Sequence, residues 1–167
     1  MMNEPAAKKS TDLQIKCQHC GGRATYQNAF KSVRSPEGYD PAHVHPFGST
    51  YVVERFPSMI AWVVGTRSYS SYGRGVASCE DCRATYVVDL VLPEHLYYRW
   101  MIRGKLLYAY NRDHAVDLLD YVESTDRDLK KYGYQAALWL KRTPKEFLSA
   151  KVRDEVVKKI RKSLKEG

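Results

Sequence analysis

The pattern of hydrophobic and polar positions divides the chain into a strand-rich first part and a helical last part. Up to about residue 110, short runs rich in β-branched and aromatic residues alternate with glycine, proline and serine, which is typical of strands and turns. The runs lie at residues 13–35, 49–56, 59–66, 84–92 and 96–110. The last run predicts a hairpin about Arg103-Gly104, whereas Pro36 to Phe47 predicts a loop. We expect about five to seven strands in the sheet.

Helical spacing takes over after residue 110 and predicts three helices, at about 111–123, 126–141 and 143–165. Asn111 is a favoured N-cap residue for the first helix. The acidic residues Asp113, Asp117 and Asp120 are expected on the wet side of that helix. Thr143-Pro144-Lys145-Glu146 predicts the start of the third helix, because it combines an N-cap threonine, a proline at the first helical position and a capping-box glutamate. Strands followed by helices place the chain in the α+β class.

Length and composition limit the possibilities. At 167 residues with 44% hydrophobic residues, the chain can bury one core or two small layers. No apolar run approaches the ~18 residues of a membrane span, and Met1 to Asp12 is short and polar, unlike a signal peptide. We therefore expect a cytoplasmic protein with residues 1–12 as a flexible tail.

Two Cys-x-x-Cys pairs, Cys17 with Cys20 and Cys79 with Cys82, use all four cysteines of the chain. Four thiolates in two such pairs can close a tetrahedral Zn²⁺ site with no open position, as structural zinc sites do. Stable disulfides are rare in the cytoplasm. A redox-active pair would open a helix, whereas Cys20 precedes two glycines and Cys82 precedes a strand-like run. Structural zinc is therefore the favoured interpretation, and incidental pairing of thiols is the alternative.

The separation of the two pairs along the chain is unusually long. Cys20 and Cys79 have 58 residues between them, against about 15 to 20 in a compact double-knuckle motif. The insert at residues 21–78 must therefore bring its own structure. The runs at 49–56 and 59–66 supply candidate strands for it.

These knuckles resemble those of zinc ribbons, in which each Cys-x-x-Cys occupies a turn between antiparallel strands and the two turns clasp one metal. The sequence from Cys17 to Gly22 carries most of the resemblance, because glycine permits the positive φ angles and close backbone approach of a tight metal knuckle. The whole chain also resembles short zinc-ribbon proteins of unassigned role in bacteria and their phages. The resemblance implies one structural Zn²⁺ with four ligands: Cys17, Cys20, Cys79 and Cys82. Together with the strand and helix patterns, it leads us to expect a zinc-ribbon-like β domain at 13–110, followed by a helical part at 111–167 that packs on the sheet.

Positive charge gathers at the end of the chain. The net charge of +8 divides into +3 for residues 1–85 (ten Lys/Arg against seven Asp/Glu), −1 for 86–140 (seven against eight) and +6 for 141–167 (ten against four). Four lysines of the third helix share one solvent-facing stripe by their spacing: Lys151, Lys158, Lys162 and Lys165. Such a stripe can follow a phosphate backbone, although a solvated polar face explains it equally well.

A second basic segment precedes the second knuckle. In Thr66 to Gly75, Arg67 and Arg74 are interleaved with Tyr69 and Tyr72 among small residues. Arginine can pair with phosphates and tyrosine can stack on unpaired bases. A long hairpin turn is the alternative interpretation of this segment.

Catalysis finds little support in the sequence. No nucleophile elbow, phosphate-cradling loop or His-Glu-x-x-His motif is present, and every cysteine is already assigned to metal. His43 and His45 could bind a second metal, with Asp40 as the nearest further donor, but exposed loop residues are the simpler interpretation. We therefore expect a protein that is not an enzyme.

Non-catalytic nucleic-acid binding, mainly through phosphate contacts, is the function that these observations favour. The contacts would come from the arginine–tyrosine segment and the lysine stripe. The rival is a protein-interaction adaptor or regulatory subunit, which uses the zinc ribbon as a rigid platform and docks its tyrosine-rich hairpin at 96–110 onto a partner. DNA and RNA stay equally open, as do the oligomeric state and a host or phage role. Neither interpretation requires a membrane or a small-molecule substrate.

Overall fold

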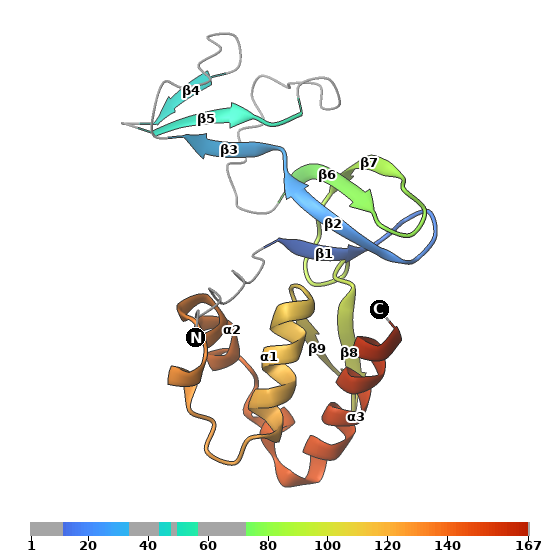
Figure 1. Ribbon diagram of the computed structural model, residues 1–167, viewed down its shortest axis with the longest axis vertical. Coiled ribbons are helices and arrows are strands. Elements are labelled where there is room, and N and C mark those ends of the chain that lie inside the picture. The colour runs from blue at the N-terminus through green and yellow to red at the C-terminus, as the bar shows by residue number, and fades with distance from the viewer. Residues whose placement is uncertain (1–11, 34–43, 48–49, 57–72, 167) are drawn as a thin grey trace, which may run out of the picture. The chain divides into compact units, whose positions relative to one another are not determined.

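The structure is a computed structural model that describes residues 12–33, 44–47, 50–56 and 73–166, and within 30–54 only the course of the backbone. Its strands precede its helices, so the predicted α+β class is confirmed (Figure 1). The strands are β1 (Leu13–Lys16), β2 (Arg23–Asn28), β3 (Phe30–Val33), β4 (Val44–Phe47), β5 (Thr50–Glu54), β6 (Arg74–Cys79), β7 (Thr85–Asp89), β8 (Tyr98–Ile102) and β9 (Lys105–Ala109). The helices are α1 (Arg112–Glu123), α2 (Tyr134–Lys141) and α3 (Ala150–Glu166), with 3₁₀ turns η1 (Leu129–Lys131) and η2 (Lys145–Leu148).

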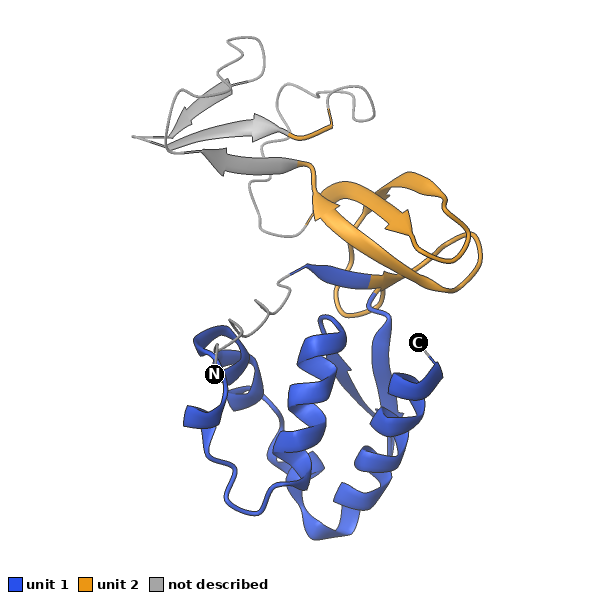
Figure 2. Cartoon of the chain, in the orientation of Figure 1, with its two compact units in different colours: residues 1–14, 96–167 blue, residues 15–95 orange. Residues whose placement is uncertain are grey.

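Contacts divide the chain into two compact units (Figure 2). Unit 1 comprises residues 1–14 and 96–167, and unit 2 comprises residues 15–95. The β8–β9 hairpin therefore groups with the helices, whereas the expected β domain at 13–110 includes it. The physical reason is burial, because the apolar side chains of the hairpin share one core with α1 and α3.

Unit 2 carries both cysteine pairs on one four-stranded sheet of order β1-β2-β6-β7. Strand β2 pairs antiparallel with β6, which places Ala24 opposite Cys79. Strand β6 pairs antiparallel with β7, which places Ser78 opposite Thr85. The long insert leaves this sheet after β2 and returns at β6, so it does not separate the two knuckles in space.

Part of the insert forms a second sheet of order β3-β5-β4, with both pairings antiparallel. The prediction of a loop from Pro36 to Phe47 is wrong at its end, because β4 pairs with β5 from Val44 opposite Val53 to Phe47 opposite Thr50. Pro46 is compatible with that pairing, since β4 is an edge strand. The predicted strand at 59–66 lies outside the described residues.

Unit 1 is built around a core that the hairpin shares with the helices. The turn at Arg103-Gly104 joins β8 to β9 as predicted, and alternate residues of β8 are buried. The largest contributors to the core are Tyr98, Trp100, Ile102, Leu107, Leu118, Tyr121, Val122, Leu140, Phe147, Val156 and Ile160. Burying a large apolar side chain stabilises a fold by roughly 1.5–3 kcal/mol, so this core is the main source of stability for the unit.

The first two helices follow the prediction only in part. Asn111 caps α1 as predicted, since its Oδ1 accepts the N–H of His114 at 2.8 Å. The wet-side prediction fails at Asp117, which is buried because α1 is covered by both α2 and α3. The second helix begins at Tyr134 rather than near residue 126, because Arg127 adopts a left-handed conformation with φ 46° and η1 intervenes.

The third helix also begins later than predicted. Its first turn was expected at Thr143, but Lys145–Leu148 is a 3₁₀ turn without a side-chain cap. This turn places Phe147 in the core with 2% of its surface exposed. Ser149 then adopts an extended conformation, so α3 starts at Ala150. Burial of one aromatic side chain therefore overrides the capping signal.

His114 should give unit 1 a pH-dependent stability. Its side chain is 4% exposed, and burial lowers its pKa from 6.5 to about 4. Between pH 4 and 6.5 the unfolded chain binds a proton at His114 that the folded chain does not. The contribution of His114 to the free energy of unfolding is therefore highest above pH 6.5 and decreases as the pH falls toward 4. NMR titration should therefore show an imidazole that stays neutral to about pH 4.

A matched variant separates this contribution from other acid effects. Between pH 7 and 4, wild type should lose up to about 3 kcal/mol more unfolding free energy than His114→Gln. Denaturant titrations at both pH values measure the difference. An NMR pKa near 6.5, or parallel losses in the two proteins, would contradict the assignment.

Candidate metal centre and basic surface

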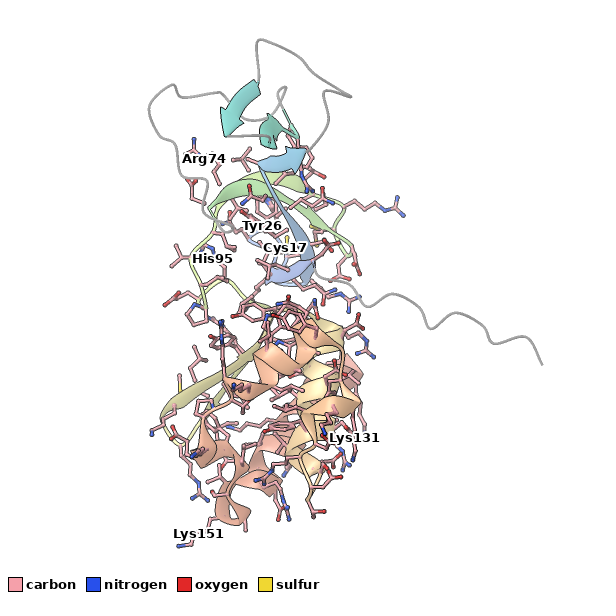
Figure 3. All side chains as sticks on the ribbon, turned by 90° about the vertical axis from the view of Figure 1, so that its left-hand side faces the viewer. Cys17, Tyr26, Arg74, His95, Lys131 and Lys151 are labelled. Atoms are coloured by element: carbon pink, nitrogen blue, oxygen red, sulfur yellow. The ribbon has the colours of Figure 1, made fainter. Side chains whose placement is uncertain are left out.

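The four cysteines of unit 2 meet in one cluster, in which Cys17 (labelled in Figure 3) and Cys79 are buried and Cys20 and Cys82 are exposed. Their sulfur atoms all lie within 4.8 Å of one another, with Cys17 Sγ 3.8 Å from Cys82 Sγ and Cys20 Sγ 3.6 Å from Cys79 Sγ. These separations far exceed a disulfide bond of about 2.05 Å. The separations of 3.8 and 3.6 Å are close to the edge of a tetrahedral site, because metal–sulfur bonds of about 2.3 Å give edges of about 3.8 Å. The cysteines are therefore positioned to bind one metal ion.

Two glycines shape the first knuckle, which joins β1 to β2. Gly21 has a φ of +77°, in the left-handed region, and its N–H donates to the carbonyl of Cys17 at 2.9 Å. Gly22 has no room for a side chain, because a Cβ there would lie 1.9 Å from a carboxylate oxygen of Asp81. The knuckle therefore needs glycine at the first position for conformation and at the second for space.

Contacts outside the cysteines tie the two knuckles together. The Asp81 carboxylate, in the second knuckle, accepts the N–H of Arg23 at 3.1 Å, and the Arg23 guanidinium donates to Glu80 at 2.7 Å. The hydroxyl of Tyr86 on β7 accepts the N–H of Gln18 at 3.1 Å. These residues are missing from the sequence predictions, because only the register of the strands brings them together. They hold the backbone from which the cysteines project.

The four sulfurs compete for their protons. Burial raises the pKa of the Cys17 thiol, but hydrogen bonds from backbone N–H groups and the neighbouring thiols outweigh burial and lower the pKa to about 6. At Cys20 the N–H of Gly22 lowers the thiol pKa, but the neighbouring thiols and burial outweigh this hydrogen bond and raise the pKa to about 12. One thiolate among close sulfurs thus makes the next harder to form, and a bound cation removes that penalty. The electrostatics of the cluster favour a cation as its geometry does.

The donor set of the cluster consists of sulfur atoms. Among the described residues, no histidine or carboxylate joins the four cysteines within metal-binding distance. His19, inside the first knuckle, is exposed and contacts the Tyr86 ring edge-on at 5.0 Å. Catalytic sites keep one coordination position open for water or substrate, whereas four sulfurs fill a tetrahedron. The cluster therefore has the composition of a structural site.

The arginine–tyrosine segment is described only at its end. Arg67, Tyr69 and Tyr72 lie outside the described residues. Arg74, labelled in Figure 3, donates two hydrogen bonds to the carboxylate of Asp89, at 2.9 and 3.1 Å, across the β6–β7 pair. This partnership raises the pKa of Arg74 and lowers the pKa of Asp89. Arg74 is thus satisfied within unit 2 and does not present a free cation.

The lysine stripe lies on the exposed surface of α3. All four predicted lysines are exposed: Lys151, Lys158, Lys162 and Lys165. The last three line one open depression of about 750 Å³ between α3 and the end of α1. Lys151 stands apart at the start of the helix, where its side chain extends away from the unit (Figure 3).

The depression is strongly positive. Its charged lining consists of five cations and two acids: Arg153, Lys158, Arg161, Lys162 and Lys165 with Glu123 and Asp154. Arg161 is ion-paired with Glu123, and Lys162 lies 3.7 Å from Glu166. The other three cations have no ion-pair partner among the residues that the structure describes. The two arginines lie off the predicted stripe but line the same depression.

A second metal site is the remaining prediction, at His43 and His45 with Asp40. Asp40 and His43 lie outside the described residues, and only the backbone of His45 is described, in β4. A second metal site at these residues therefore stays a prediction.

None of the described helices is long and apolar enough to cross a bilayer.

Comparison of the chain with protein-family models, curated proteins and solved structures found no match. The likeness to zinc ribbons rests on the cysteine spacing and on the cluster itself, which is compatible with such a site. Function must therefore be argued from the residues of the site.

Loss of one sulfur should release the metal and weaken unit 2. We expect about one metal ion per purified chain, and Cys79→Ser should retain far less. The free energy of unfolding should fall by several kcal/mol, because the binding energy of a structural metal is folding energy. Elemental analysis and denaturant titration measure the two effects. The control His19→Ala should keep its metal; a metal-free control, or full metal content in Cys79→Ser, would refute the ligand assignment.

Proposed function

We propose that this chain is a non-catalytic, zinc-stabilised protein that binds nucleic acid through the basic surface of α3. Zinc is assigned by donor chemistry, since a tetrahedral set of four thiolates suits Zn²⁺ or iron–sulfur centres. Zn²⁺ is the usual ion where two Cys-x-x-Cys knuckles clasp a single metal. It has no redox chemistry and would act here only as a staple for the sheet.

The observation that carries the proposal is the excess of unpaired cations on α3. The helix contains seven Lys/Arg against three Asp/Glu, a net charge of +4. Three cations of the adjoining depression have no carboxylate partner among the described residues. A concentrated positive field attracts a polyanion, and each phosphate that is neutralised releases condensed counterions. Nucleic acid is the polyanion that best fits an elongated surface of this kind.

The length of the surface also suits a phosphate backbone. At a rise of 1.5 Å per residue, Lys151 to Lys165 extend over about 21 Å, enough to face several phosphates. Lysines on a helix surface reach phosphates without reading base edges. We therefore expect binding that is largely independent of sequence.

A protein-interaction adaptor is the second candidate, and the outer face of the hairpin favours it. Met101 is 57% exposed on β8, and Tyr108 is 37% exposed on β9. Such residues could dock onto a partner, and they do not depend on the charge of α3. Binding assays that vary salt separate the two candidates, because apolar docking is insensitive to moderate salt.

Nucleic-acid binding should weaken steeply with salt. With about four phosphate contacts to a single strand, affinity should fall about 50-fold between 50 and 200 mM monovalent salt. Lys158→Gln/Lys165→Gln removes two unpaired cations and should lower the salt slope by about 1.4. Fluorescence anisotropy with labelled oligonucleotides of mixed sequence, repeated over a salt series, gives both values.

A charge-matched control locates the effect on α3. Lys16→Gln/Lys130→Gln also removes two exposed lysines, neither of which lines the depression. This variant should keep most of the wild-type slope. Affinity that barely changes with salt, or equal losses in the two double variants, would overturn the proposal.

A further inference from the structure

A small aromatic pocket lies in unit 1 apart from the basic depression. It has a volume of about 140 Å³ and is bordered by β9, the start of α1 and the end of α2 with the residues that follow. Its polar and aromatic lining consists of Tyr108, Tyr110, His114, Trp139, Arg142 and Thr143. None of these residues belongs to the metal cluster or to the lysine stripe.

His114 brings an unused hydrogen-bond donor to this pocket. The side chain is 4% exposed, and its Nδ1 accepts the N–H of Tyr110 at 3.2 Å. A neutral imidazole whose Nδ1 accepts must carry its proton on Nε2. That N–H has no partner among the described residues, yet it is not sealed from solvent. A buried donor that is open only to a pocket is available to a ligand there.

Three aromatic rings stand together around this donor. The rings of Tyr110 and His114 are stacked with centroids 5.5 Å apart. The Trp139 ring lies 4.8 Å from His114 and 5.0 Å from Tyr110. Flat aromatic surfaces of this kind are stacking platforms for other planar rings.

The charge of the lining points to an acceptor-rich, anionic ligand. Arg142 is exposed and has no ion-pair partner among the described residues. No aspartate or glutamate lines the pocket, so its polar groups are mainly donors. A guanidinium beside aromatic rings can hold a phosphate while a planar group stacks.

Size decides which planar group fits. Pockets for drug-sized ligands measure about 300–1,000 Å³, so a pocket of about 140 Å³ cannot enclose a whole nucleotide cofactor. It has room for a single small ring of a ligand, and the rest of that ligand would stay outside the pocket. A pyrimidine carries carbonyl acceptors on such a ring, and a purine is larger.

The geometry points to this pocket as the site of one unpaired pyrimidine base of a bound strand, with Arg142 on the adjacent phosphate. The inference rests on the proposed function and narrows it, because a base within a duplex cannot enter the pocket. The chain should therefore prefer single strands. Both dT and U oligonucleotides are candidate ligands, since their bases share the same ring carbonyls.

The test compares the full chain with two variants of the stacking residue. Trp139→Leu removes the aromatic face, and Trp139→Phe preserves it as a matched control. The two single strands are 12-nucleotide oligomers of dT and of U. Trp139→Leu should weaken binding about tenfold for whichever of the two binds wild type more tightly, with affinity for a 12-base-pair duplex unchanged. Trp139→Phe should stay within about twofold of wild type. Circular dichroism and denaturant titration establish that both variants are folded.

Mononucleotides separate this inference from the proposed function. By ligand-observed NMR, dTMP or UMP should bind to wild type and to Lys158→Gln/Lys165→Gln, but not to Trp139→Leu. No mononucleotide binding to wild type, or equal loss of single-strand and duplex binding in Trp139→Leu, would overturn the pocket assignment. Salt-independent oligonucleotide binding would instead overturn the role of α3 while leaving the mononucleotide result intact.

Discussion

The meeting of four cysteine sulfurs in one cluster, positioned to bind one metal ion, is the constraint that organises unit 2. The strands of its four-stranded sheet are only four to six residues long, and a long insert leaves and rejoins the sheet between β2 and β6. Without a cation, each thiolate raises the cost of forming the next. A divalent metal would offset this repulsion, because its positive charge attracts every ionised sulfur. An ion bound by the cluster would thereby join two turns that 58 residues separate along the chain.

Unit 1 is stabilised by different means. Its core is apolar, Asn111 caps α1, and Nδ1 of the buried His114 accepts a local hydrogen bond. Because the core holds the helices without a metal, α3 can present cations that have no carboxylate partner among the described residues. The aromatic pocket likewise has a donor left over after its internal contacts are made.

Local chemistry made the fold class and the metal cluster predictable. The two Cys-x-x-Cys pairs, the glycines at Gly21 and Gly22 and the cap at Asn111 all express requirements of a few neighbouring residues. Predictions failed where distant residues decide the outcome. The helix expected at Thr143 gave way because Phe147 reaches the core, and Asp117 is buried because a second helix covers its side of α1. The pocket about His114 combines β9, α1 and α2, which no spacing along the sequence reveals.

X-ray absorption at the zinc edge of the purified full-length protein tests the central claim most directly. We predict a first shell of four sulfur atoms at about 2.3 Å, since Cys17, Cys20, Cys79 and Cys82 are positioned to bind one metal ion. A shell that contains nitrogen or oxygen in place of one or more sulfurs would contradict it. So would a fully folded protein that contains no metal.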